Sequence, residues 1–269
     1  FRSAIEINPK FTLALTNLAT ASMSAGRLDE AEQACRQALA AQPDLIPALH
    51  SLGTVKAARG ERPAAEALFE RVLALDPGHE LARINLGSVK SAEGKYAEAE
   101  ADFRIVLNVA PDNAEAHLNL GFCLADQGHL DEALQCFRRT VALEPRKIEA
   151  YYALATSSQP KFNDTDRANI EALSRAKGLT MDQQVKLQFV LSSIALGDGD
   201  RPLGFHYCRQ GNEIRKIMLG GEGQAFDGAD HAARLQAMAQ TFSRQFIEAR
   251  ADWGEPNAGL IFIIGMPRS

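Results

Sequence analysis

The last ten residues of this 269-residue chain carry the groups best suited to bind an anion. Leu260–Gly265 is a continuous apolar run with β-branched and aromatic side chains, which is the pattern of a buried parallel strand. Gly265 permits a tight turn, and Pro267 fixes it. Arg268 can offer a planar fork of donors to a phosphate, and Ser269 adds a hydroxyl where a following helix would begin. The run therefore predicts a phosphate-binding turn without a Walker sequence; the alternative is a core strand and its turn.

A second set of polar side chains recurs through the first half of the chain. Asn17, Asn85 and Asn119 return at one position of successive units, and Ser51 interrupts them. A carboxamide is both donor and acceptor, so such a row can hold an extended peptide by its backbone. The alternative is that each Asn bonds the backbone of a neighbouring unit. Three further polar residues belong to the same predicted surface: His50, Thr54 and Ser88.

A repeat of 34 residues positions these side chains. Its clearest markers return at that step: Pro9, Pro43, Pro77, Pro111 and Pro145, with Gly26, Gly60, Gly94 and Gly128. Units counted from Thr12, Ile46, Glu80, Ala114 and Ile148 have Ala or Gly at position eight and, in the four full units, Cys or Phe at position twenty-four. Small residues let two antiparallel helices approach, and the large side chain fills the seam between them. We expect the glycine to end the first helix with a positive φ and the proline to end the second.

These positions resemble the tetratricopeptide repeat over residues 12–158, as four full repeats and a partial fifth. Residues 1–11 align with the end of an upstream second helix, so we expect the chain to be cut from a longer array. The resemblance implies a mainly α fold, a right-handed α-solenoid whose concave wall is lined by first helices. It also implies a protein or peptide partner in that groove. The aromatic residue usual at position four is replaced in four units: Leu15, Leu49, Arg83 and His117.

Residues 159–252 form a predicted helical connector with a degenerate repeat-like pair. One helix is predicted to run through Ala176, capped by one of three residues: Asp164, Thr165 or Asp166. Thr180 with Gln183 forms a capping box for the next helix, to about Leu196. Its partner begins near Arg201, after a turn at Gly199 and with Gly204 at the small position. Residues 230–250 predict an amphipathic helix that packs against the next domain.

The order of these parts resembles bacterial proteins that fuse tetratricopeptide repeats to a sulfotransferase domain, here beginning at residues 253–269. In that family the strand and Gly-x-Pro-Arg-Ser turn form the 5′-phosphosulfate loop. The resemblance implies that 3′-phosphoadenosine 5′-phosphosulfate (PAPS) is the co-substrate and that a hydroxyl, for example that of a protein tyrosine, accepts the sulfuryl group. The implied PAPS contacts are Gly265, Pro267, Arg268 and Ser269. Because the base and the 3′-phosphate site would lie beyond Ser269, we expect this chain alone to be inactive. The alternative is a non-enzymatic protein-interaction scaffold.

Composition excludes several other classes. A net charge of −5 disfavours a general nucleic-acid binder. The four cysteines form no CxxC pair, which favours a reducing, cytoplasmic setting. No apolar run reaches the roughly 18 residues of a membrane helix. Four histidines lack the spacing of a zinc site, so no metal is predicted: His50, His117, His206 and His231.

Overall fold

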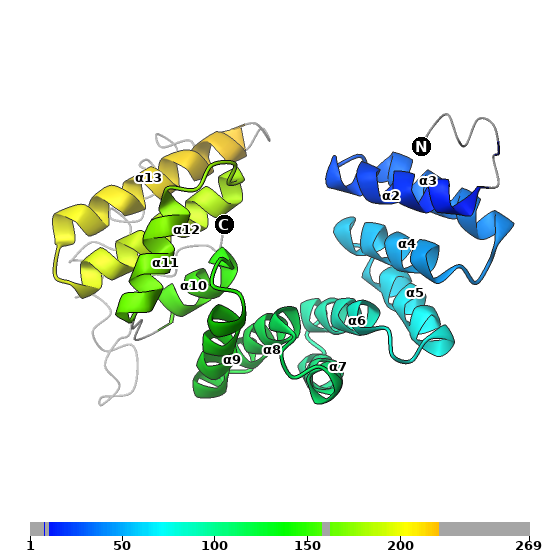
Figure 1. Ribbon diagram of the computed structural model, residues 1–269, viewed down its shortest axis with the longest axis horizontal. Coiled ribbons are helices and arrows are strands. Elements are labelled where there is room, and N and C mark those ends of the chain that lie inside the picture. The colour runs from blue at the N-terminus through cyan, green and yellow to red at the C-terminus, as the bar shows by residue number, and fades with distance from the viewer. Residues whose placement is uncertain (1–7, 9–10, 158–161, 221–269) are drawn as a thin grey trace, which may run out of the picture. The chain divides into compact units, whose positions relative to one another are not determined.

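The computed structural model describes residues 8, 11–157 and 162–220, which contain twelve helices and no strand (Figure 1). The first helices of the repeats are α2 (Thr12–Ser24), α4 (Ile46–Ala58), α6 (Glu80–Ala92), α8 (Ala114–Asp126) and α10 (Ile148–Ala155). The second helices are α3 (Leu28–Ala41), α5 (Arg62–Leu75), α7 (Tyr96–Val109) and α9 (Leu130–Leu143). Three more helices follow: α11 (Asp164–Ser174), α12 (Met181–Gly197) and α13 (Arg201–Gly220).

Two compact units divide the chain, residues 1–215 and 216–269. The repeat array lies in the first unit. The predicted strand at residues 260–265 and the predicted helix at residues 230–250 lie outside the described residues, so both stay predictions.

Each full repeat is a pair of antiparallel helices, and a glycine–phenylalanine contact closes three of the four. In the third repeat, Gly87 of α6 lies under the ring of Phe103 from α7. A Cβ atom at Gly87 would lie 2.7 Å from Cε1 of that ring, closer than real Cβ contacts allow. The same arrangement recurs in the second and fourth repeats. In the first repeat the two positions hold Ala19 and Cys35, both fully buried. Glycine is required where the facing residue is Phe, because the ring occupies the space of a Cβ.

The helix ends follow the repeat markers. The turn glycines that follow the first helices all have positive φ, from 71° at Gly26 to 85° at Gly128, which confirms the prediction. Each second helix ends two residues before its proline, for example α5 at Leu75 before Pro77. The residue between them, Asp76, has ψ 91°, since a following proline disfavours the α region.

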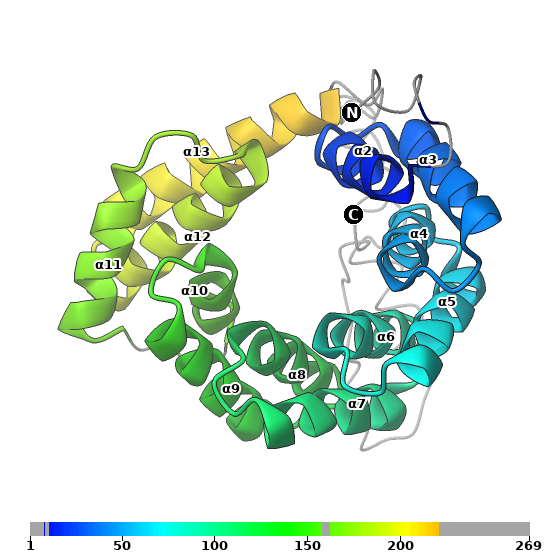
Figure 2. The same cartoon turned by 45° about the vertical axis from the view of Figure 1, so that its right-hand side comes forward.

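Successive repeats stack through an ordered set of helix contacts. Each second helix packs against the next first helix, as α5 does on α6 and α7 on α8. Neighbouring first helices also contact one another, from α2 through α8. Figure 2 shows α4, α6 and α8 in one row and α5, α7 and α9 in the row behind it. The first-helix row therefore presents one continuous face of the array.

Position four of the repeat has a shared hydrogen-bonding role that its residue types conceal. Arg83 Nη2 donates to the carbonyl oxygen of Pro77 at 3.1 Å. His117 Nε2 lies 2.9 Å from the carbonyl of Pro111, and the Tyr151 hydroxyl donates to that of Pro145 at 3.2 Å. Each bond ties a first helix to the proline that ends the preceding repeat. In the first two repeats the position holds buried leucines.

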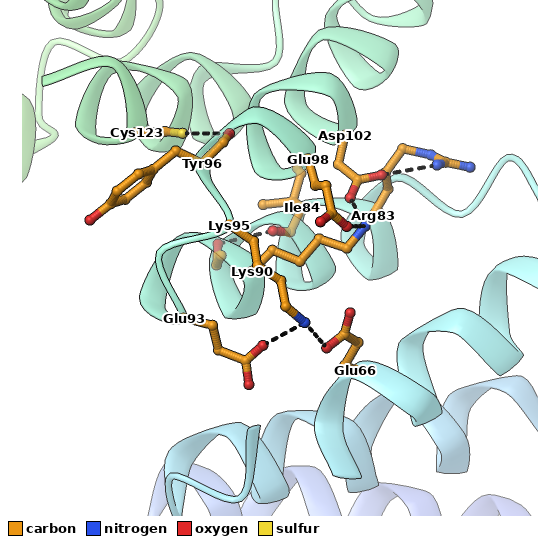
Figure 3. A network of polar contacts seen from close by, with 11 residues as sticks. Glu66, Arg83, Ile84, Lys90, Glu93, Lys95, Tyr96, Glu98, Asp102 and Cys123 are labelled. Atoms are coloured by element: carbon orange, nitrogen blue, oxygen red, sulfur yellow. Dashed lines mark hydrogen bonds and ion pairs between the residues drawn. The ribbon is translucent and has the colours of Figure 1, made fainter. Parts of the chain in front are cut away.

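The glutamate at position twenty-one of the first three repeats forms an ion pair or a hydrogen bond with the next repeat. Glu32 pairs with Lys56 at 2.9 Å and with Arg59 at 2.7 Å, both in the next repeat. Glu66 pairs with Lys95 at 3.0 Å, and Lys95 also reaches a glutamate of its own repeat (Figure 3). Glu100 accepts from Gln127 Nε2 at 3.1 Å. These ties fix neighbouring repeats to one another on the second-helix side.

The array changes its packing after α10. Both α10 and α11 pack against α12, so the repeat pairing stops there. The cap of α11 is Asn163, in a capping box with Asp166, and α11 ends at Ser174 rather than Ala176. The capping box of Thr180 with Gln183 is confirmed. Gly204 packs against the side chain of Leu196, as a small residue at the helix seam should.

Candidate functional site

The predicted groove residues all lie on first helices, but their side chains differ in solvent exposure. Asn17 on α2 is exposed, whereas Asn85 on α6 and Asn119 on α8 are half-buried. His50 and Thr54 on α4 are half-buried too, as is one further residue, Ser88 of α6. None of these side chains is fully buried, so each is partly accessible to solvent.

Asn85 is held by a histidine of the preceding repeat. Its Nδ2 lies 3.0 Å from His50 Nε2. A neutral imidazole with a bare Nε2 accepts from the carboxamide, and a protonated one cannot. The contact therefore fixes the side chain of Asn85 while leaving its Oδ1 free to accept from a peptide N–H.

His50 sits in a stack of rings at the junction of the second and third repeats. Its ring is stacked on His79, with centroids 5.3 Å apart, and tilted against Phe69 at 5.8 Å. His79 Nδ1 accepts from the backbone of Ala82 and so caps α6. Burial, followed by the nearby His79, lowers the pKa of His50 below its ordinary value, and a backbone hydrogen bond to Leu81 offsets part of this. The neutral form that bonds Asn85 is thereby favoured.

The lowered pKa of His50 predicts a loss of stability in mild acid. An unfolded histidine takes up its proton near pH 6.5, before the folded His50 does. The free energy of unfolding should therefore be unaffected by this group above that pH, and should fall as the pH drops toward the folded pKa. Urea denaturation from pH 8 to about 5 measures the slope. His50→Gln should flatten that slope, whereas His206→Gln, at an exposed histidine of α13, is the matched control.

Asn119 is engaged within its own repeat. Its Nδ2 donates to the backbone carbonyl of Glu115 at 2.9 Å and lies 3.3 Å from Glu115 Oε1. Lys147 of the next repeat pairs with the same carboxylate at 2.6 Å. The three carboxamides thus have different surroundings: Asn17 is open to solvent, Asn85 is bonded across repeats, and Asn119 is bonded along its helix. Neither bonded Asn contacts a neighbouring repeat's backbone, the alternative that the sequence left open.

Three of the predicted groove residues meet at one pocket of about 240 Å³ between the second and third repeats. Thr54, Asn85 and Ser88 line it together with the Phe69 ring and Arg62. The Thr54 hydroxyl donates to the His50 carbonyl at 3.1 Å, and the Ser88 hydroxyl donates within its own helix at 2.9 Å. Their oxygens remain available as acceptors, so the pocket offers acceptors, one cation and an aromatic floor.

Sequence reasoning did not identify Arg62 or His79 as part of this surface. Arg62 lies at the start of α5, and His79 is the residue before α6. Arg62 belongs to no repeating polar position, but His79 does. The equivalent residues Asn113 and Lys147 are also polar, and Asn113 caps α8 as His79 caps α6, so this signal was available in the sequence. They join the site because two repeats meet there.

Residues of metal-ligating type are scattered over the described part of the chain. Its His, Cys, Asp and Glu side chains form no group of three or more that could hold a metal ion. Burial, with Glu32 nearby, raises the pKa of Cys35 to about 12, so its thiol stays protonated and inert. The predicted PAPS contacts Gly265, Pro267, Arg268 and Ser269 lie outside the described residues. None of the described helices is long and apolar enough to cross a bilayer.

Paired antiparallel helices, repeated at a fixed step and stacked through their first helices, define a helical repeat protein. Two family models, both of the tetratricopeptide repeat, match residues 11–77 and 90–157. The chain is therefore a tetratricopeptide repeat protein. No curated protein matches its sequence.

Solved structures share this fold at low sequence identity. PilF from Pseudomonas aeruginosa has a TM-score of 0.59 at 17% identity, over 84% of this chain and 97% of that one. PilW, described as a widely conserved type IV pilus biogenesis factor, has a TM-score of 0.58 at 20% identity, over 88% and 97%. A tetratricopeptide repeat protein from Parabacteroides merdae has a TM-score of 0.57 at 21% identity, over 79% and 83%. These similarities establish the fold alone.

Proposed function

We propose that this chain is an interaction scaffold that binds an extended peptide segment of a partner protein on its first-helix face. The observation that carries the proposal is the pocket where Thr54, Asn85 and Ser88 converge. Side chains from two repeats meet there with unused acceptors beside an aromatic ring. Backbone N–H groups of an extended peptide are the donors that such acceptors complement. A right-handed coiling of the array, implied by the family resemblance, would make this face concave.

Removing two carboxamides tests this proposal. Peptides selected from a random twelve-residue display library on the wild-type protein are titrated by fluorescence anisotropy against the double variant Asn85→Ala/Asn119→Ala. Each lost hydrogen bond is worth about 0.5–1.5 kcal/mol, so we expect the two to weaken binding about tenfold or more. Asn108→Ala, at an exposed Asn of the second helix α7, is the matched control and should bind as the wild type does. Equal affinities for all three proteins, with unchanged helicity, would overturn the proposal.

A second candidate function rests on the C-terminal sequence. We propose that the parent protein is a PAPS-dependent sulfotransferase whose repeats orient a protein acceptor in the cytoplasm. Its support is the strand-and-turn sequence LIFIIGMPRS after a tetratricopeptide array. Sequencing the parent gene past Ser269 tests this proposal. Gly-Thr-Thr at the start of a helix would support the sulfotransferase. Any other continuation would contradict it, and only the scaffold function would remain.

A further inference from the structure

One junction between repeats differs from the others in the chemistry of its pocket. Between the fourth and fifth repeats a pocket of about 230 Å³ lies among α8, α9 and α10. Seven of its nine lining residues are apolar, among them Phe122, Leu130, Leu134, Phe137 and Ala153; the other two are Thr156 and Ser157. Counted from the start of each repeat, it occupies the same place as the Asn85 pocket two repeats earlier. Phe122 stands where Thr54 does, and Ala153 where Asn85 does.

Four positions of the repeat change together at this junction. Position nine is Thr or Ser elsewhere and Phe122 here; position six is Asn or Ser elsewhere and Ala153 here. Position twenty-one, the glutamate that ties repeats together, is Leu134. Position thirteen is Ser or Ala in the first three repeats and Asp126 in the fourth. Three changes replace a polar side chain by an apolar one, and the fourth places a carboxylate on α8 next to Ala125, which lines the pocket.

The apolar walls are left open to solvent. Phe122 is 41% exposed, although its ring packs on Phe137 at a centroid distance of 5.2 Å, and Leu130 is 53% exposed. A cavity of about 150 Å³ lined by apolar side chains is large enough to hold a benzene molecule. The present pocket can therefore take one large side chain, whose burial would remove these exposed apolar walls from water.

Carboxylates near the pocket indicate the charge of the ligand residue next to that side chain. Asp126 lies one helical turn beyond Phe122 on α8 and is exposed, with no ion pair among the described residues. Asp131, at the start of α9 and next to Leu130, is a second exposed carboxylate. No Lys or Arg of the described chain lines the pocket. A ligand that places a cation beside its apolar group would complement this rim.

We propose that this pocket is a specificity site for a large apolar side chain of the bound peptide, adjacent in the peptide to a Lys or Arg that pairs with Asp126. The inference rests on the proposed peptide-binding function and names the sequence feature that the peptide must carry. Asn119 and Phe122 are three residues apart on α8 and so share one helix face. A peptide that lies along the carboxamides therefore passes the mouth of the pocket.

Three labelled peptides and two variants test the inference. The Lys-Phe probe is a capped peptide, Gly-Ser-Gly-Lys-Phe-Ser-Gly-Ser-Gly; the others replace its Phe by Ala or its Lys by Glu. We expect the wild-type protein to bind the Lys-Phe probe about tenfold more tightly than the Ala probe, as for a buried anchor residue. It should bind the Glu probe about threefold to tenfold more weakly than the Lys-Phe probe, since the pair is at an exposed rim.

The two variants assign the preference to the pocket. Phe122→Thr restores the residue type of the other repeats and should abolish the discrimination between Phe and Ala probes. Asp126→Lys should reverse the preference between the Lys and Glu probes, a result that misfolding cannot produce. A probe with benzoylphenylalanine in place of Phe should photo-crosslink within residues 122–157, the span of the pocket's lining.

Each other outcome counts against the inference. Equal binding of all three probes, unchanged preferences in both variants, or crosslinks outside residues 122–157 would overturn it. Absence of probe binding, as when another part of this chain or a second copy fills the pocket, would overturn it too. If display-selected peptides still bind and depend on Asn85 and Asn119, the proposed function stands without this pocket. If no peptide binds at all, both are wrong.

Discussion

Replacing Phe103 by alanine should lower the free energy of unfolding by about 3–5 kcal/mol, the usual cost of deleting a buried aromatic side chain. Phe103 is 1% exposed and belongs to the core cluster that joins the third, fourth and fifth repeats. Its ring lies directly over Gly87, so truncation opens a cavity between two rigid helices rather than at a surface. Because repeats are stabilised chiefly by their neighbours, the loss should weaken both adjoining interfaces. Urea denaturation followed by circular dichroism measures it.

An exposed phenylalanine gives the matched control. Phe205 on α13 is 69% exposed, and its replacement by alanine should change stability by no more than about 0.5 kcal/mol. The same atoms are removed in both variants, so the difference between them reports burial alone. A cost below about 1 kcal/mol for Phe103→Ala, well under the range for buried aromatics, would contradict the described core.

Adding a single methyl group at Gly87 should also destabilise the protein. In Gly87→Ala the new Cβ would lie 2.7 Å from Phe103 Cε1 and 2.9 Å from its Cζ, so the buried ring must shift within the core. Overpacking of this kind costs about 1–3 kcal/mol. The higher helix propensity of alanine offsets about 1 kcal/mol of that cost, so the net loss is smaller than that of Phe103→Ala. Thermal and urea denaturation measure the net change.

Two further variants separate the clash from the effect of helix propensity. A Cβ at Gly197, the last residue of α12, meets no atom within 4 Å. Gly197→Ala should therefore be neutral or stabilise by less than about 1 kcal/mol, the opposite sign to Gly87→Ala. In a Phe103→Cys background, Gly87→Ala should lose its cost, because that pair reproduces Ala19 and Cys35 of the first repeat. Additive effects of Gly87→Ala and Phe103→Cys would show that the ring is not the cause.

The repeat positions could be predicted because each reports a local requirement. A glycine with φ near 75°, as at Gly60, is required by the turn whatever lies around it. A proline at the end of a second helix acts on its own backbone and on its immediate predecessor. Helix starts at Thr12, Ile46 and their equivalents followed from these markers alone.

Position four shows where such reasoning ends. The sequence places Arg83, His117 and Tyr151 there, three side chains with little chemistry in common. Only the structure reveals that each reaches a prolyl carbonyl of the preceding repeat, at 2.9–3.2 Å. In these three repeats the shared feature is a donor that reaches the same carbonyl, and residue type is a poor guide to that; Leu15 and Leu49 fill the position without one.

The carboxamide row illustrates the same limit at the candidate site. Its regular spacing predicted equivalent side chains, yet Asn85 is bonded to His50 across a repeat junction and Asn119 to its own helix. The apolar pocket at Phe122 was not predicted either, because its walls come from three helices.

By itself, the sequence determined the repeat length, the helix pairs and the residues that close each pair, because all of these depend on contacts within about one repeat. Only the tertiary structure decided which polar groups are already bonded, which remain open to a partner, and which junction forms an apolar pocket. These properties arise where two or three repeats meet. Their distances are set by how helices stack, and the order of residues along one helix does not contain that information.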